Sequence, residues 1–443
     1  MTGSRSGPQA MDSKLPTPHR GGRRATDTSS ARHHSHLTTA RMASSLWWPH
    51  PSALIVLVLL PIYVSVLTYD FSKHVPMAYV PGGNYWFGFA LFLAMLVGVQ
   101  WALAHGRTLP VRSPPHISNR AMWLLLVPTL LAYALWFGPV LSSPDLLLEV
   151  FRGERSEIRD DVSTIKGVTT FTQWGVAYVI AYGIKASYEP SSLTRVHRIG
   201  LVLIFSLALF RAFAWAERLA VIELAVCFGI TRLSNTQLSA GWRIRAANVV
   251  PALAPVALYG LFTLSEYFRT WEHLKNQYSS VWALSLDRLT TYYATAINNG
   301  IGMLVELKGW PFYSSAFAVE WMWKTPGVGS LLSASIDDPR WVKLHWLERY
   351  GNVAFNSPTA YFNIVLDLGY FGAVVYHLVL GYIIGRAYLG WQKGHVFGLL
   401  MYGVFVLHLL ESLRFSYLAE TRFVPLALGL AVLALDMRSQ RRR

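Results

Sequence analysis

Residues 85–105 read YWFGFALFLAMLVGVQWALAH and contain no aspartate, glutamate, lysine or arginine. An α-helix rises about 1.5 Å per residue, so about 20 apolar residues cross a hydrocarbon core of about 30 Å. Of the 443 residues, 53% are hydrophobic and 14% are charged. A soluble domain carries roughly 25% charged residues. The sequence therefore predicts an all-α polytopic membrane protein that sits in the lipid bilayer.

Nine further apolar stretches flank this run, which gives about ten expected transmembrane helices and one large extracytoplasmic loop. The expected spans are Trp47–Tyr69, Tyr85–His105, Ala121–Leu141, Phe171–Ser187, Ile199–Phe213, Ala216–Ile230, Asn248–Tyr267, Tyr370–Leu389, Val396–Leu413 and Phe423–Met437. The first seven fall within residues 47–267 and the last three within 370–437. We expect the loop, residues 268–369, to contain short helices and turns. Two basic tails remain, a polar one at 1–46 with too little apolar content to fold and a short one at 438–443.

The lysines and arginines indicate the side on which each connection lies. The two tails and the even-numbered connections between spans hold 22 of the 39, and 8 of the other 17 lie in the long loop. Short cytoplasmic loops are enriched in Lys and Arg, whereas long loops do not count in this rule. The distribution therefore predicts that the N-terminus and the C-terminus are cytoplasmic and that the long loop is not.

The composition also argues against several classes of protein. The net charge of +15 suggests a nucleic-acid partner in some chains, but here the basic residues gather between apolar runs and in the tails, so we expect none. Cys227 is the single cysteine, which excludes an intrachain disulfide and a thiolate metal cluster. There is no zinc motif and no phosphate-binding glycine loop, and we expect neither a metal nor a cofactor. The long polar tail is unlike a cleavable secretory signal and resembles an Arg- and Ser-rich transit peptide only in composition.

Three arginines are expected at the non-cytoplasmic edge of the membrane. Arg211 and Arg218 lie where spans five and six meet, and Arg269 follows span seven within the sequence SEYFRT. A guanidinium offers a planar fork of donors that matches phosphate oxygens. The alternatives are an ion pair with Glu217 or snorkelling to the interface, and the residues alone leave these open.

The long loop supplies further candidates. Its tryptophans and the pair Tyr292 and Tyr293 offer faces on which sugar rings stack, with an interfacial aromatic belt as the alternative. Histidine is a common general base, which makes His345 a candidate proton acceptor. Asp367 precedes span eight, where it is either a proton acceptor or a charge partner of the helix N-terminus.

Several segments resemble, in order and spacing, those of bacterial oligosaccharide repeat-unit polymerases, the Wzy-like O-antigen polymerase family. They are NSPTAY from Asn356, DLGYFG from Asp367 and the glycine-spaced GYIIG from Gly381. The arginine between spans five and six, the Glu-Tyr-Phe-Arg exit of span seven and the Tyr-Tyr pair are also similar. The resemblance covers roughly Lys166–Trp391.

The resemblance implies a GT-C-like membrane glycosyltransferase that polymerises polyprenyl-diphosphate-linked oligosaccharide repeat units into O-antigen, capsule or exopolysaccharide. The reaction would take place on the periplasmic face of the bacterial inner membrane, with a chain-length regulator and a flippase as candidate partners. The implied site has three parts: a diphosphate clamp (Arg211, Arg218, Arg269), a proton acceptor (Asp367 or His345) and sugar-binding residues (Tyr292, Tyr293, Arg349, Asn356).

Other functions remain open from the sequence. An O-antigen ligase has the same architecture but transfers finished glycan to a lipid core. A transporter or flippase for lipid-linked sugars is expected to show internal repeats and broken helices at the midplane, which the sequence does not display. A non-catalytic scaffold does not account for arginines at membrane depth, which are costly and often functional.

Overall fold

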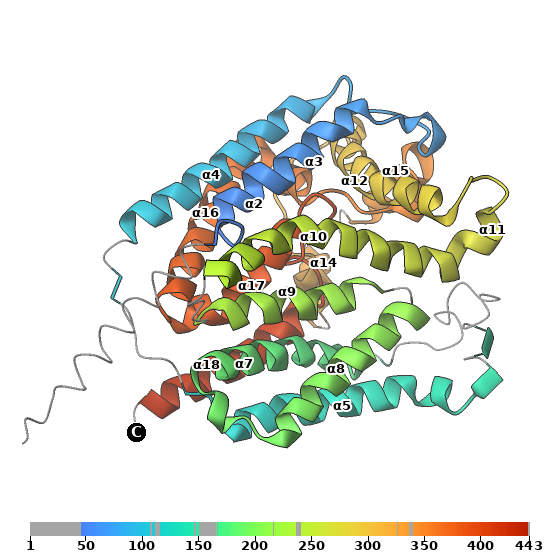
Figure 1. Cartoon of the computed structure of the whole chain (residues 1–443). Coiled ribbons are helices and arrows are strands. Elements are labelled where there is room, and N and C mark those ends of the chain that lie inside the picture. The colour runs from blue at the N-terminus through green and yellow to red at the C-terminus, as the bar shows by residue number, and fades with distance from the viewer. Residues whose placement is uncertain are drawn as a thin grey trace, which may run out of the picture. The chain divides into compact units, whose positions relative to one another are not determined.

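The computed structural model describes residues 46–106, 109–110, 116–145, 148–149, 165, 167–215, 217–235, 241–325, 327–335 and 340–441, without the side chains of 241–244, 269, 333–335, 340, 341 and 441. The regular elements within these residues are helices (Figure 1). Seven of the described helical segments are long and apolar enough to cross a membrane, which confirms the predicted polytopic helical membrane protein. They are Pro51–Thr68 (α2, η1, α3 and η2), Asn84–His105 (η4 and α4, Phe87–His105), α5 (Asn119–Leu141), α8 (Arg195–Ala214), Arg245–Glu266 in α10 (Gly241–Glu266), α16 (Ala360–Gln392) and Phe423–Gln440 in α18 (Phe423–Arg441).

Three of the expected spans form shorter helices. α7 (Trp174–Tyr188) and α9 (Leu219–Leu233) have 15 residues each, and α17 (Val396–Glu411) has 16. Fifteen residues of α-helix extend only about 22 Å, less than the hydrocarbon core of about 30 Å. All ten expected apolar stretches are thus helical, while the number that crosses the membrane stays a prediction.

α4 and α16 pack with their backbones in contact. A Cβ added at Gly98 of α4 would collide with the carbonyl oxygen of Leu378, and one added at Gly381 of α16 would collide with that of Met95. Small residues allow membrane helices to approach this closely, and the contact replaces a hydrophobic driving force that lipid does not provide. The glycine spacing of the GYIIG segment is therefore explained by helix packing.

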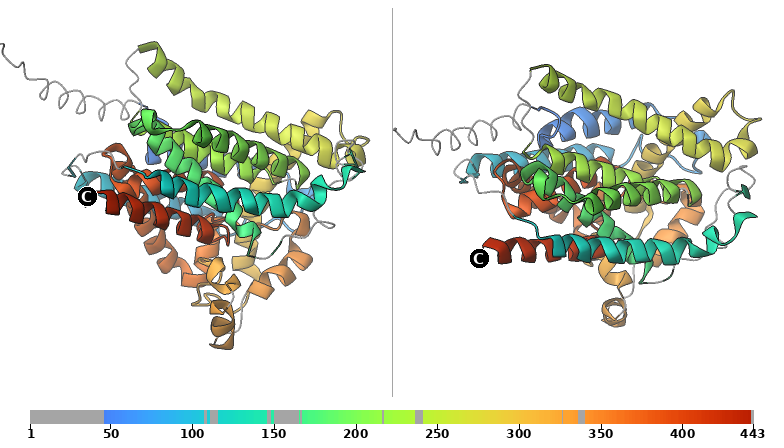
Figure 2. Two further views of the ribbon diagram at one scale, coloured as in Figure 1. Left: turned by 90° about the horizontal axis from the view of Figure 1, so that it is seen from below. Right: turned by 60° about the horizontal axis from the view of Figure 1, so that its bottom comes forward.

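α10 lies along an edge of the helical bundle, beside α12 (Figure 2). In its most apolar window 11% of the residues are buried, against 33–44% in the other six candidate membrane helices. Its exposed side chains include Leu253 and Val256. Because lipid covers such side chains at no cost, the exposure is consistent with a helix that faces the bilayer.

α16 begins ten residues before the expected eighth span and is broken internally. Gly369 has φ 70° and ψ 177°, a backbone conformation that glycine adopts without steric cost, and it interrupts the helix. Residues 360–368, assigned to the long loop from the sequence, form the first helical segment. The second segment begins at Tyr370, where the eighth span was expected, and Asp367 lies near the end of the first segment.

The long loop contains one long helix, which corrects the expectation of short helices and turns only. α12 (Val281–Glu306) has 26 residues and is buried on all sides from Ala294 to Leu304. Asn298 and Asn299, within this part, bind the backbones of Met77, Tyr79 and Phe355. These two asparagines therefore bind other segments of the chain. The remaining elements of the loop are η7 (Tyr267–Trp271), α11 (Glu272–Leu274), α13 (Glu320–Lys324), α14 (Val328–Ser335), α15 (Arg340–Tyr350) and η8 (Val353–Phe355).

Candidate functional site

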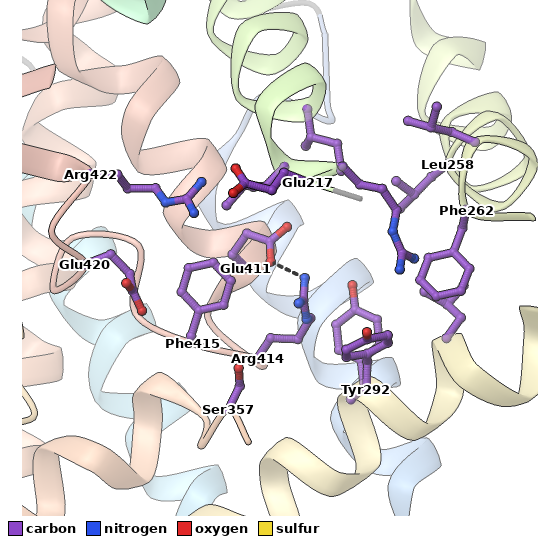
Figure 3. Close-up of a pocket in the computed structure, with 16 residues that line it drawn as sticks. Glu217, Leu258, Phe262, Tyr292, Ser357, Glu411, Arg414, Phe415, Glu420 and Arg422 are labelled. Carbon is purple, nitrogen blue, oxygen red and sulfur yellow. Dashed lines mark hydrogen bonds and ion pairs between the residues drawn. The ribbon is translucent and has the colours of Figure 1, made fainter. Parts of the chain in front are cut away.

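A cavity of about 280 Å³ lies where α9, α10, α12 and α17 approach one another (Figure 3). Its wall combines apolar and aromatic side chains with three arginines and three glutamates. The lining residues come from the segment before α9 and its start, the last part of α10, the middle of α12, the segment before α16, the end of α17 and the connection between α17 and α18. They are Glu217, Arg218, Leu219, Ile222, Leu258, Leu261, Phe262, Leu289, Tyr292, Tyr293, Ser357, Glu411, Arg414, Phe415, Glu420 and Arg422.

Arg414 lies over aromatic faces in the wall of the cavity. Its Nη1 donates to Oε2 of Glu411 at 3.0 Å. The guanidinium carbon lies 5.0 Å from the ring centre of Tyr292 and 5.5 Å from that of Phe415. Its Nε is buried and has no hydrogen-bond partner among the described residues. A guanidinium held by its face in this way keeps donors available for an anionic ligand.

Arg218 enters the cavity from the start of α9. Its guanidinium carbon lies 3.8 Å from the ring centre of Phe262, and its Nη2 donates to Oε1 of Glu266 at 2.7 Å. Glu266 is fully buried, and its Oε2 also lies 3.1 Å from Nε of Arg288 and accepts from Oγ1 of Thr270 at 2.6 Å. One carboxylate thus fixes two guanidinium groups that come from different elements.

Arg211 does not line the cavity. Its Nε donates to Oε2 of Glu217 at 2.8 Å, and its Nη1 donates to Oγ1 of Thr172 at 3.4 Å. The guanidinium carbon lies 4.9 Å from the ring centre of Trp136, and the side chain is 8% exposed. The structure therefore corrects the expectation that Arg211 clamps a diphosphate. The ion pair with Glu217 is formed, and Arg211 holds that carboxylate at the cavity wall.

Tyr292 and Tyr293 both line the cavity. Burial, followed by the nearby Glu411 carboxylate, raises the pKa of Tyr293 to about 12 against the opposing charge of Arg414. Its hydroxyl is therefore protonated at neutral pH and can donate a hydrogen bond. The sequence placed these two residues correctly beside Arg218, while their role in sugar binding stays a prediction.

The connection between α17 and α18 supplies residues that sequence reasoning missed. Glu411, Arg414, Glu420 and Arg422 all line the cavity. Nη1 of Arg422 is buried without a hydrogen-bond partner among the described residues, and its guanidinium points toward Glu217 in Figure 3. Two arginines and two glutamates within twelve residues, between two apolar helices, were the signal that could have found this segment.

No protein family model, characterised relative or solved structure matches the chain. The resemblance to repeat-unit polymerases therefore rests on the sequence motifs themselves. Any functional assignment has to be argued from the cavity.

The two expected proton acceptors lie away from the cavity. Asp367 is fully buried, and its Oδ1 accepts from Oγ of Ser314 at 2.8 Å. Its Oδ2 accepts from the backbone N–H groups of Phe317 at 3.0 Å and Ala318 at 2.6 Å. Asp367 thus holds a turn of the long loop against α16, and its expected role as a proton acceptor stays a prediction. His345 is exposed on α15 and does not line the cavity either.

The other expected site residues are also apart from the cavity wall. Arg349 is exposed on α15, and its guanidinium carbon lies 5.3 Å from the ring centre of Tyr350. Asn356 is exposed, although the next residue, Ser357, lines the cavity. Arg269 lies in η7, but its side chain is outside the described residues. Its expected contact with a diphosphate therefore stays a prediction.

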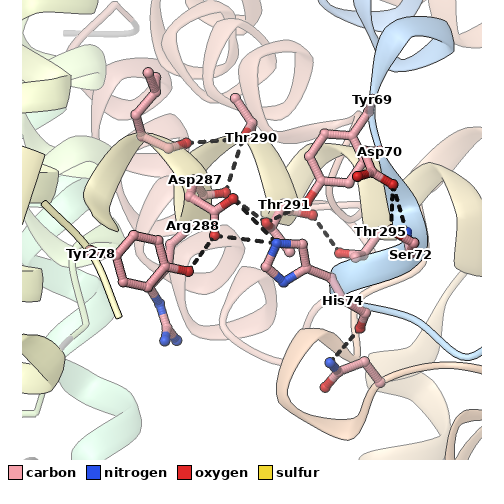
Figure 4. Close-up of polar contacts among 12 residues, drawn as sticks. Tyr69, Asp70, Ser72, His74, Tyr278, Asp287, Arg288, Thr290, Thr291 and Thr295 are labelled. Atoms are coloured by element: carbon pink, nitrogen blue, oxygen red, sulfur yellow. Dashed lines mark hydrogen bonds and ion pairs between the residues drawn. The ribbon is translucent and has the colours of Figure 1, made fainter. Parts of the chain in front are cut away.

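A polar cluster positions α12, the helix that carries the two tyrosines (Figure 4). The carboxylate of Asp287 accepts from Oη of Tyr278 at 2.8 Å and lies 3.2 Å from Nε2 of His74. Oη of Tyr69 lies 2.6 Å from Oγ1 of Thr291. These contacts fasten the connection between the first two membrane helices onto α12.

The cavity offers a defined set of binding groups. Among the described residues, no group of three or more His, Cys, Asp or Glu side chains is arranged to hold a metal ion. The wall presents guanidinium, carboxylate, phenol and aromatic groups instead. Such a set suits an anionic ligand that also carries hydroxyl groups and an apolar part.

Proposed function

We propose that this protein is a membrane glycosyltransferase that polymerises polyprenyl-diphosphate-linked oligosaccharide repeat units on the non-cytoplasmic face of the bacterial inner membrane. The observation that carries the proposal is the cavity, where Arg218, Arg414 and Arg422 meet Tyr292 and Tyr293. Guanidinium donors match diphosphate oxygens, and aromatic faces suit sugar rings. The product is O-antigen, capsule or exopolysaccharide.

The reaction moves the growing glycan from its lipid diphosphate to a hydroxyl group of the incoming repeat. Negative charge develops on the diphosphate as the sugar–phosphate bond breaks, and preorganised arginines stabilise this charge in the transition state. The sugar–phosphate bond supplies the driving force, so no nucleotide site is required. Apolar side chains of α9 and α10, among them Ile222, Leu258 and Leu261, form part of the wall and suit the lipid portion of the substrate.

The predicted topology supports a site on one face of the membrane. The cavity is lined from the connection between spans five and six, the end of span seven, the long loop and the connection between spans nine and ten. The charge distribution assigns each of these to the non-cytoplasmic side. Transporters bind their substrates near the midplane, between structural repeats, so this placement favours a transferase.

The direct test incubates the purified protein, in lipid nanodiscs, with a single lipid-linked repeat and separates the products by size. We expect a ladder from the wild type and from Arg198→Ala, which removes an exposed arginine remote from the cavity. Arg414→Ala and Arg422→Ala should lose the ladder, because each removes donors from the leaving group. Wild-type protein that leaves the single repeat unchanged would contradict the proposal. Transfer of a preformed long glycan to a lipid acceptor, without a ladder, would instead indicate a ligase.

A further inference from the structure

The three glutamates of the cavity wall differ in what surrounds them. Glu217 accepts from Arg211 at 2.8 Å, and Glu411 accepts from Arg414 at 3.0 Å. Glu420 lines the same cavity, yet in the part of the chain that the structure describes its carboxylate has no hydrogen-bond or ion-pair partner. Donors bound to a carboxylate favour its ionised form and make it a weaker base. Glu420 is therefore the carboxylate of the wall that is available to take up a proton.

The long loop sets the environment of Glu420. The backbone N–H of Trp321, in α13, donates to the carbonyl oxygen of Ala419 at 2.9 Å and brings the start of α13 beside the connection between α17 and α18. Glu320, the first residue of α13, forms an ion pair with Lys324 at 2.6 Å. A second carboxylate thus lies near Glu420, with its own cation already bound.

Burial and this second carboxylate act on Glu420 in the same direction. Burial first, and the negative charge of Glu320 second, raise the pKa of Glu420 above its ordinary value of 4.5, against the opposing charges of Arg422, Lys324 and Lys343. A general base is most effective when its pKa approaches the working pH, because it then binds a proton strongly and still carries its charge. The surroundings shift Glu420 toward that condition.

We propose that Glu420 accepts the proton of the attacking sugar hydroxyl, an inference that rests on the proposed glycosyltransferase function. The hydroxyl oxygen forms a bond to the anomeric carbon of the growing glycan. The bond between that carbon and the phosphate oxygen breaks, and its electron pair stays on the lipid diphosphate. The hydroxyl proton moves to the Glu420 carboxylate and then to water, which restores the base. Arg422, two residues further on, also lines the wall and offers guanidinium donors to the leaving diphosphate in this proposal.

The test measures initial rates of ladder formation against pH, together with binding of the lipid diphosphate. Glu420→Gln should lower kcat by about 10²- to 10⁴-fold, leave diphosphate binding unchanged and remove the acidic limb of the pH profile. Glu420→Asp keeps a carboxylate and should restore part of the rate. Glu272→Gln, which changes an exposed glutamate in α11, is the matched control and should behave as wild type.

A second variant tests the same proposal with Glu420 intact. Glu320→Gln removes a negative charge that raises the pKa of Glu420 and releases Lys324, whose charge lowers it. The base must be deprotonated to act, so the acidic limb should move to lower pH. A purely structural role of Glu420 would not produce this shift.

The outcomes separate this inference from the function on which it rests. If the wild type makes no ladder, the proposed function fails and the inference fails with it. If the wild type makes a ladder and Glu420→Gln keeps its rate and its acidic limb, the function stands and Glu420 is not the base. Loss of diphosphate binding in Glu420→Gln would also overturn the inference, since it would assign Glu420 to the structure of the site.

Discussion

The turn at Asp367 and the connection between α17 and α18 hold carboxylates that differ in their hydrogen-bond partners. Asp367 is inaccessible and accepts from three donors within the chain. Glu420 lines a cavity and has no such partner among the described residues. Asp367 belongs to the motif that resembles a known family, whereas Glu420 belongs to none. The difference teaches that a recognisable motif can mark a structural anchor, while a short connection that carries no motif supplies charged residues to a cavity wall.

The largest expected effect is the loss of stability in Asp367→Ala. Three donors around a fully buried carboxylate would lose their acceptor, which we expect to lower the free energy of unfolding by about 3–5 kcal/mol. Thermal unfolding in detergent and the yield of folded protein measure this loss, and Asp367→Asn should lose less because it keeps one acceptor oxygen. Wild-type stability together with absent turnover would make Asp367 a reactive group and reverse the comparison.

Arg414→Ala should have the next largest effect, on turnover rather than on stability. Removing one donor group from a developing anion typically lowers kcat by about 10²- to 10³-fold. Arg414→Lys keeps the charge but loses the planar fork that lies over Tyr292. Its rate should therefore fall between those of the wild type and Arg414→Ala. Initial rates of ladder formation measure this order. A lysine variant that keeps the wild-type rate would show that the fork of Arg414 does not matter.

Gly381→Ala sharpens the comparison by disturbing a region that is remote from both carboxylates. The added methyl group would press against the backbone of Met95, and we expect a loss of about 1–3 kcal/mol in the free energy of unfolding. Gly229→Ala is the matched control, since a Cβ at this helical position meets nothing within 4 Å. Turnover per folded molecule should be unchanged in both variants. A stable Gly381→Ala protein would refute the close contact of α4 with α16.

His345→Ala and Arg349→Ala should have the smallest effects. Both side chains are exposed on α15, outside the cavity wall, and surface substitutions of this kind change stability by less than about 0.5 kcal/mol. Turnover and thermal unfolding should match the wild type. A loss of turnover in either variant would restore the site that the sequence suggested.

The helical membrane architecture could be predicted from the sequence, because the thickness of the hydrocarbon core sets the minimum length of an apolar run that crosses it. Few helices of soluble proteins need an apolar run of that length. The sequence did not predict α12 as a long helix, because its buried asparagines bind distant segments. Asn298 binds the backbone of Tyr79, and Asn299 binds the backbone of Phe355. Apolar periodicity contains no information about such pairs. The break at Gly369 was likewise hidden, since a single glycine inside an apolar run does not reveal its φ angle.

The candidate site was predicted in part. Arg218 and the two tyrosines were found, because they lie at a membrane edge in recognisable segments. Arg414 and Arg422 entered the sequence analysis only in the count of basic residues that predicts the topology. Their positions close to Glu411 and Glu420 in the sequence distinguish them from the other basic residues of the connections. The role of Asp367 depended on Ser314, 53 residues away in the sequence, and no local pattern connects the two.

Glu266 carries one negative charge and holds two guanidinium groups, those of Arg218 and Arg288. The described wall and its supports therefore retain an excess positive charge. Such a field reaches about one Debye length, about 8 Å at 0.15 M ionic strength. The association rate of a lipid diphosphate should fall as salt is added, whereas the dissociation rate, set by desolvated contacts, should hardly change.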